Sequence, residues 1–125
     1  MRWQTMLKAE DVRLKATTGE IISVIRISAH PEKRREFFLT ISSLLDSIKR
    51  EEGCRDCRFY EEAGDHDSFL LVGEWNTGAD YYRHASSEQF AVLQGALKVL
   101  SQQKHLDFRL LSRIDGIEPF ATLQT

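Results

Sequence analysis

A chain of 125 residues has the size of one domain and is too short to hold two ordinary hydrophobic cores. Hydrophobic residues make up 42% and charged residues 29% of the sequence, which is typical of a globular protein and not of a disordered or membrane-spanning one. The formal net charge of -2 offers no basic surface for a nucleic acid, and no run of Lys or Arg suggests an anionic membrane. We therefore expect neither nucleic acid nor a membrane among the partners.

The compartment is predicted from the first residues and the cysteines. Residues 1–20 carry several charges and lack the apolar segment of a secretory signal. No stretch approaches the roughly 20 apolar residues that span a bilayer. We therefore expect a cytoplasmic location, where Cys54 and Cys57 stay reduced as thiols.

The first regular elements are a strand and a long helix. Residues 21–27 are rich in β-branched side chains and predict a buried strand. Pro31 suits the first turn of a helix, and Gly53 is placed to end it. The apolar stripe of the helix between them consists of Phe37, Ile41, Leu44, Leu45 and Ile48. We predict a helix over residues 31–51.

Two further strands form a predicted hairpin. Residues 54–62 and 68–75 are strand-like, and the short polar connector 63–67 contains a glycine. Both faces of the second strand are mainly apolar, with Phe69, Leu71, Gly73 and Trp75 on one and Leu70, Val72 and Glu74 on the other. A single sheet with helices on one face cannot cover both sides of this strand. Something else must cover the second face.

The last third of the chain predicts two helices and a strand. Asn76 or Thr77 can cap a short helix that holds two tyrosines and His84. Residues 86–89 match a Ser-x-x-Gln capping box and begin a second helix with an apolar stripe. Residues 106–114 alternate as a strand.

The order strand, helix, strand, strand, helix, strand is that of the α+β, ferredoxin-like β-α-β-β-α-β fold. It predicts a four-stranded antiparallel sheet with its helices on one face. Because the strands are too apolar to leave the other face wet, we expect two such sheets to pack face to face in a homodimer. The expected domain covers residues 20–115, flanked by an N-terminal arm of uncertain structure over 1–19 and a C-terminal tail over 116–125.

At this point the sequence resembles a known family. The motifs are Gly53-Cys54, Phe59-Tyr60, the run Phe-Leu-Leu-Val-Gly-Glu-Trp over residues 69–75, then His84 and Phe90. Their order and spacing resemble the antibiotic-biosynthesis-monooxygenase family, which includes quinol monooxygenases. The resemblance covers about residues 20–115 and implies a dimeric α/β barrel. It also implies three activity classes: cofactor-independent oxygenation of quinols and polyketide phenols, haem degradation, or no assigned reaction.

Cofactor-independent oxygenation needs a site that ionises its own substrate. Dioxygen reacts poorly with closed-shell molecules unless they are electron-rich, so the protein must hold a phenol, quinol or enol and remove a proton. His84 is the candidate base, because imidazole titrates near neutrality. Tyr81, three residues earlier on the same side of the helix, is the candidate phenol donor. The candidates for the substrate-binding walls are Trp75, Tyr82, Phe90 and Phe37.

Each of these residues also has a plainer interpretation as core or interface packing. The oxygenase hypothesis acts on a small electron-rich aromatic ligand and requires no cofactor and no metal. The alternative is a non-catalytic homodimer that binds a small ligand or a partner. Haem degradation is disfavoured, because the first strand has no Asn, His84 stands where those enzymes have Trp, and Gln94 stands where they have His.

Two remaining pairs are interpreted as structural. Arg26 lies within an apolar strand and needs a partner, and Glu74 is the candidate for a structural ion pair with it. Cys54 and Cys57 have a Cys-x-x-Cys spacing, but on a strand we expect them to point to opposite faces. No second Cys pair completes a zinc site, so we expect no metal or redox role.

Overall fold

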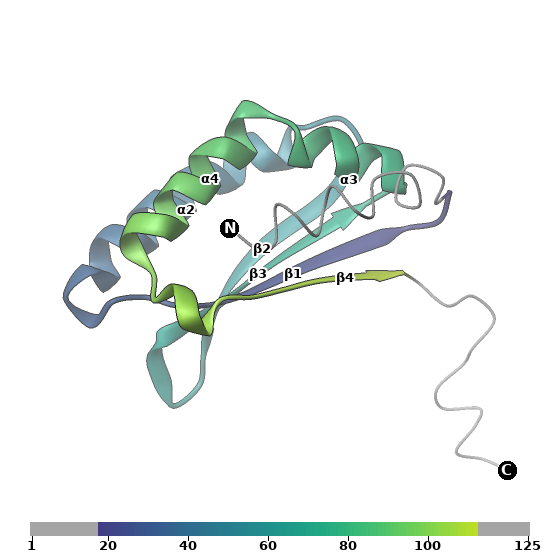
Figure 1. Cartoon of the computed structure of the whole chain (residues 1–125). Coiled ribbons are helices and arrows are strands. Elements are labelled where there is room, and N and C mark those ends of the chain that lie inside the picture. The colour runs from purple at the N-terminus through teal and green to yellow at the C-terminus, as the bar shows by residue number, and fades with distance from the viewer. Residues whose placement is uncertain (1–17, 113–125) are drawn as a thin grey trace, which may run out of the picture.

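A computed structural model describes residues 18–112 (Figure 1). The elements are β1 (Ile21–Ser28), the 3₁₀ turn η1 (Pro31–Lys33), α2 (Arg34–Lys49), β2 (Cys54–Glu62), β3 (Asp65–Trp75), α3 (Gly78–Ala85), α4 (Glu88–Leu100), the 3₁₀ turn η2 (Gln103–His105) and β4 (Asp107–Ser112). The proposed arm over 1–19 and tail over 116–125 fall almost wholly outside the described residues.

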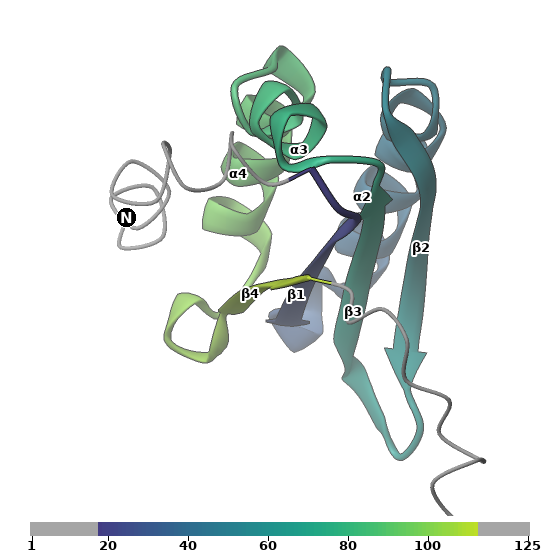
Figure 2. The same ribbon diagram turned by 90° about the vertical axis from the view of Figure 1, so that its right-hand side faces the viewer.

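The four strands form one antiparallel sheet in the order β2-β3-β1-β4. The helices α2 and α4 lie on the same face of this sheet, and the β2–β3 hairpin extends beyond it in both views (Figures 1 and 2). This topology confirms the predicted ferredoxin-like α+β fold. The helix-facing positions of β1 and β3 pair as Ile21 with Trp75, Ser23 with Gly73, Ile25 with Leu71, and Ile27 with Phe69. All eight are buried, and they form the sheet side of the core.

Two helix starts differ from their predicted form. The predicted helix over 31–51 begins as a 3₁₀ turn at Pro31, continues as α2 and ends at Lys49. The N-cap of α4 lies one residue beyond the predicted capping box of residues 86–89, because Ser87 is the N-cap and its Oγ accepts a hydrogen bond from the N–H of Phe90 at 3.2 Å. Both Ser86 and Ser87 are suitable N-cap residues, but only Ser86 has a Gln three residues later, so the predicted box is not formed at the observed N-cap.

The sheet face away from the helices is apolar at its centre. Ile22 and Val24 of β1 lie beside Leu70 and Val72 of β3, and all four are half-buried within the single chain. At the two edges of this face Tyr60 is 46% exposed and Leu111 is 49% exposed. The two-faced apolar pattern of the strands is therefore present in the fold, and no helix in residues 18–112 covers this second face.

The expected ion pair between Arg26 and Glu74 is not found within the described chain. In the register Arg26 lies opposite Leu70, whereas Glu74 lies opposite Ile22, so the two charges sit at opposite ends of the strands. Arg26 pairs with Glu62 of β2 instead. Arg26 and Glu74 share a face of the sheet, but the prediction had no information about the position of each charge along the strands.

No helix among the described residues is long and apolar enough to cross a bilayer.

Candidate functional site

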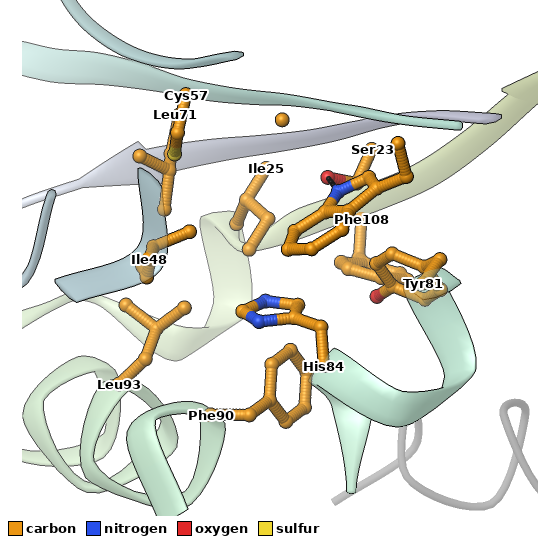
Figure 3. A pocket seen from close by; sticks show the side chains of 12 residues that line it. Ser23, Ile25, Ile48, Cys57, Leu71, Tyr81, His84, Phe90, Leu93 and Phe108 are labelled. Atoms are coloured by element: carbon orange, nitrogen blue, oxygen red, sulfur yellow. Dashed lines mark hydrogen bonds between the residues drawn. The ribbon is translucent and has the colours of Figure 1, made fainter. Parts of the chain in front are cut away.

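A small cavity of about 10 Å³ lies between the sheet and the helices, at the end of the fold where α3 sits (Figure 3). A cavity of this size accommodates about one water molecule. The residues that line it are Ser23, Ile25, Ile48, Cys57, Leu71, Gly73, Trp75, Tyr81, His84, Phe90, Leu93 and Phe108. Most of these side chains are hydrocarbon or aromatic, so the few polar atoms among them define the chemistry.

The short helix α3 brings the imidazole and a phenol to this cavity. Thr77 caps the helix, because its Oγ1 accepts a hydrogen bond from the N–H of Asp80 at 3.2 Å. Tyr81 and His84 are three residues apart, so they share one side of the helix, and both are at least 95% buried. Tyr82 points elsewhere and is only half-buried.

The turn between α2 and β2 holds α3 in place. Gly53 adopts a φ of +83°, and a Cβ at this residue would collide with the side chain of Asp80. Further along α3, Arg83 forms an ion pair with Glu52 at 3.7 Å. His84 then forms a hydrogen bond with Glu51. Three consecutive residues of the turn therefore meet three residues of α3.

His84, which is buried, and Glu51, which is partly buried, form a polar pair. The Nδ1 atom of His84 lies 3.0 and 3.1 Å from the two carboxyl oxygens of Glu51. Burial lowers the pKa of His84 to about 4 and raises the pKa of Glu51 to about 7. Removal from water thus favours the neutral form of each group. At and above about pH 7 the Nδ1–H of a neutral imidazole donates to the Glu51 carboxylate, which leaves Nε2 unprotonated.

Aromatic rings surround this imidazole. The ring of Trp75 stacks on the ring of His84 with centroids 4.4 Å apart, and Phe90 meets it edge to face at 5.2 Å. The ring of Tyr81 lies 5.8 Å from it. Burial raises the pKa of Tyr81, which keeps its phenol protonated, and its hydroxyl has no hydrogen-bond partner within residues 18–112. A buried hydroxyl of this kind is a donor suited to an acceptor in the cavity.

The opposite wall contains a second hydroxyl, from Ser23 of β1. The indole N–H of Trp75 donates to Ser23 Oγ at 3.3 Å. This contact depends on Gly73, because a Cβ there would lie 2.7 Å from both Ser23 Oγ and Trp75 Nε1. The absence of a side chain at Gly73 therefore allows the Trp75 indole to pack over β3, the strand to which both residues belong.

The two cysteines do not point to opposite faces, so that prediction is wrong. Cys54 pairs with Trp75 and Cys57 pairs with Gly73, with a register shift between Cys54 and Asp56. This β-bulge places both sulfur atoms on the helix side of the sheet. Burial raises the pKa of Cys54 to about 11 and that of Cys57 to about 12, so both are thiols at neutral pH. Residues 18–112 contain no cluster of three or more His, Cys, Asp or Glu arranged to hold a metal ion.

The structure brings four of the six predicted site residues together: Trp75, Tyr81, His84 and Phe90 line the cavity. Tyr82 does not line it. Phe37 does not line it either, because it is fully buried further along α2, where its ring packs 5.2 Å from that of Phe69.

Two polar residues of the site, Glu51 and Ser23, were missed by reasoning from the sequence. Glu51 is the last residue of the predicted helix, and nothing local marks it as a partner of His84, which lies 33 positions later. Ser23 is a small residue within an apolar strand. The only signal for it was that a hydroxyl on the helix-facing side of a buried strand needs a partner.

An antiparallel four-stranded sheet with helices on one face, which together enclose a histidine among aromatic rings, defines a ferredoxin-like α+β domain with a small internal site. Residues 20–96 match the profile of the antibiotic biosynthesis monooxygenase family, and the chain belongs to this family. The resemblance drawn from the sequence motifs is thereby confirmed.

Two relatives and one solved structure illustrate the likeness. An uncharacterized protein of Synechocystis sp. is 29% identical over 82 residues, which are 66% of this chain and 54% of that protein. A Bacillus subtilis protein named "Putative monooxygenase YcnE" is 30% identical over 64 residues, 51% of this chain and 67% of that protein. This chain thus spans about half the length of the first relative. SnoaB, a cofactor-independent oxygenase from Streptomyces nogalater, shares the fold with a TM-score of 0.68 at 19% identity, covering 80% of this chain and 97% of that one.

Proposed function

We propose that this protein is a cofactor-independent monooxygenase of a small electron-rich aromatic, with His84 as its base. The observation that supports the proposal is the hydrogen bond from Nδ1 of His84 to Glu51, which directs an unprotonated Nε2 at a cavity lined by aromatic rings. A positioned neutral imidazole whose second nitrogen is held by a carboxylate is an arrangement suited to general base catalysis. Family membership supports the same reaction class.

The proposed reaction needs only dioxygen and the substrate. Nε2 of His84 removes a proton from a substrate that carries two removable hydrogens, and the anion gives one electron to dioxygen. The resulting radical and superoxide combine to form a carbon–oxygen bond. The imidazolium returns its proton to the peroxide, and loss of water breaks the O–O bond and leaves a carbonyl oxygen. One oxygen atom enters the product and the other leaves in water, so the substrate supplies both electron pairs.

Tyr81 and Glu51 support this step in different ways. The phenol of Tyr81 donates a hydrogen bond to the oxygen on which negative charge collects. Glu51 fixes the tautomer of His84 and stabilises the imidazolium that forms. Because the pKa of Glu51 is raised to about 7, the base form of the pair increases as the pH rises through that value. Activity should therefore rise with pH around neutrality.

The proposal includes a homodimer in which the open faces of two sheets pack together. Its support is the apolar centre of that face, formed by Ile22, Val24, Leu70 and Val72. A contiguous apolar surface in the middle of a sheet is expected to be buried against a partner. Alternating charges such as Arg58 and Glu74 on the same face provide complementary groups for a second copy.

The runner-up is a non-catalytic homodimer that binds a ligand or a partner protein. The size of the cavity favours it, because about 10 Å³ accommodates a water molecule and not an aromatic ring. Under the monooxygenase proposal the side chains of the cavity must move apart to admit a substrate. The two proposals therefore differ in whether the cavity opens.

Oxygen consumption separates them. The protein is incubated without oxygen with a panel of quinols and naphthols, oxygen is admitted, and its uptake is followed with an electrode. We expect uptake that falls by about 10²- to 10⁴-fold in His84→Ala, the usual contribution of a general base. His66→Ala is the matched control, since the side chain of His66 is 80% exposed on the hairpin. Uptake that persists in His84→Ala contradicts the proposed base, and no uptake with any compound favours the binding module.

A further inference from the structure

Two hydroxyl groups reach the same cavity from opposite walls (Figure 3). Tyr81 brings its phenol from α3, and Ser23 brings its hydroxyl from the middle of β1, where the residue is 8% exposed. Both are removed from bulk water, so each needs a hydrogen-bond partner inside the fold or from a ligand.

The proton of the Ser23 hydroxyl is not engaged by the chain between residues 18 and 112. Its oxygen already accepts the indole N–H of Trp75 at 3.3 Å, and no hydrogen bond donated by Ser23 is found in that part of the chain. A hydroxyl that accepts one hydrogen bond still has one proton to donate. Ser23 therefore presents a donor to the cavity.

Its neighbours fix the position of this donor. The indole approaches Ser23 Oγ across Gly73, where a Cβ would lie 2.7 Å from both the Oγ and the indole nitrogen. The indole in turn stacks on His84 with centroids 4.4 Å apart. One rigid aromatic group thus contacts both the serine on β1 and the histidine on α3, which fixes the position of the donor relative to the proposed base.

We infer that Ser23 is a substrate-binding residue that, together with Tyr81, donates two hydrogen bonds to a single substrate oxygen. This inference rests on the proposed function and assigns the two groups that recognise the oxygen of a phenol, enol or aryl ketone, which becomes an oxyanion when His84 removes a proton. Aromatic hydrocarbons without such an oxygen are excluded, since they would leave both buried donors unpaired. Preorganised donors aimed at developing negative charge stabilise the ionised form selectively.

Binding of 4-nitrophenol tests the inference without oxygen or turnover, because its visible colour reports ionisation. We expect the wild-type protein to bind the phenolate better than the phenol, so that the bound probe ionises at a lower pH than the free probe. In Ser23→Ala the pKa of the bound probe should rise by about one to two units, and phenolate affinity should fall about 10- to 100-fold. Affinity for the neutral phenol should change little.

Two further variants keep the test sharp. Ser23→Cys preserves the shape of the side chain but replaces a strong donor by a weak one, so it should show the same loss. Tyr82→Phe removes a phenol on α3 that does not line the cavity, and it should behave like the wild type. A bound-probe pKa that is unchanged in both Ser23 variants overturns the inference, and so does a wild-type protein that does not bind the probe.

The outcomes for the donor pair and for the oxygenase are separable. If oxygen uptake depends on His84 but the pKa of the bound probe is the same in the wild type and the Ser23 variants, the role of Ser23 is wrong and the proposed function stands. If the Ser23-dependent shift is found but no compound consumes oxygen, the donor pair stands as a binding site and the oxygenase fails.

Discussion

Replacing Glu51 by Gln isolates the titration of His84 within the polar pair. The amide oxygen of Gln can still accept the Nδ1–H of His84, so the hydrogen bond is kept and only the ionisable carboxyl is lost. No substrate is required, because the effect is a change in the pH dependence of the free energy of unfolding. The prediction therefore tests the site independently of any proposed reaction.

The two groups have opposite effects on stability. Burial raises the pKa of Glu51 from 4.5 to about 7, so the stability it contributes is present below pH 4.5 and is lost as the pH rises to about 7. Burial lowers the pKa of His84 from 6.5 to about 4, so the stability it contributes is present above pH 6.5 and is lost as the pH falls to about 4. Between pH 4.5 and 6.5 the two slopes cancel in the wild-type protein.

Glu51→Gln leaves only the His84 slope. Each pKa unit corresponds to about 1.4 kcal/mol, so the two-unit window gives a change of about 2–3 kcal/mol. Relative to the wild type, the free energy of unfolding of the variant should increase by that amount between pH 4.5 and 6.5. Contributions from other carboxyl groups are common to both proteins and drop out of the comparison.

Urea denaturation at pH 4.5, 5.5 and 6.5 measures this difference, and NMR of the histidine rings follows the titration of His84 directly. Glu52→Gln is the matched control, because the side chain of Glu52 is 84% exposed one residue away, and its profile should run parallel to the wild type. A Glu51→Gln profile that is also parallel to the wild type would refute the reasoning. So would a His84 ring that titrates at pH 6.5 or above.

Three other predictions concern the walls of the site and the open face. Gly73→Ala should lower the free energy of unfolding by about 1–3 kcal/mol, because the new Cβ would lie 2.7 Å from two neighbouring atoms. Gly95→Ala on α4, where the new Cβ meets open space, should raise the free energy of unfolding by about 0.5–1 kcal/mol. Denaturant titration measures both changes. Cys54 and Cys57 should react with Ellman's reagent at pH 8 at least about a hundredfold more slowly in the folded protein than in urea, and equal rates would contradict their burial. Val72→Arg should convert the proposed dimer into a monomer, as measured by analytical ultracentrifugation. A wild-type protein that sediments as a monomer would contradict the proposed dimer.

The fold could be predicted because its signals are local and periodic. A β-branched strand, one apolar helical stripe and a glycine-containing hairpin are each visible within a short window of the sequence. The same periodicity explains why Phe37 was predicted as a wall of the cavity although it does not line it. A stripe identifies which face of a helix is buried but not which end reaches the cavity, and Ile48, about three turns further along α2, is the residue that lines it.

The candidate site could be predicted only in its aromatic half. Trp75, Tyr81 and His84 lie within one short stretch, where helical spacing and the family motifs identify them. Glu51 and Ser23 reach the site through contacts that join distant parts of the chain, and no local pattern encodes such a contact. The bulge that turns Cys54 toward the helices is likewise a property of strand pairing and not of the Cys-x-x-Cys spacing.

The meeting of residues 51–53 with α3 has a consequence for tolerance to insertions. An added residue at the tip of the β2–β3 hairpin, beside the exposed Gly64, lies away from the residues that line the cavity and should leave the site intact. The same addition between α2 and β2 would shift the anchor points of Asp80, Arg83 and His84 all at once. The two connections thus differ in what an insertion changes: in the hairpin it leaves the site in place, whereas between α2 and β2 it displaces the residues that hold the proposed base.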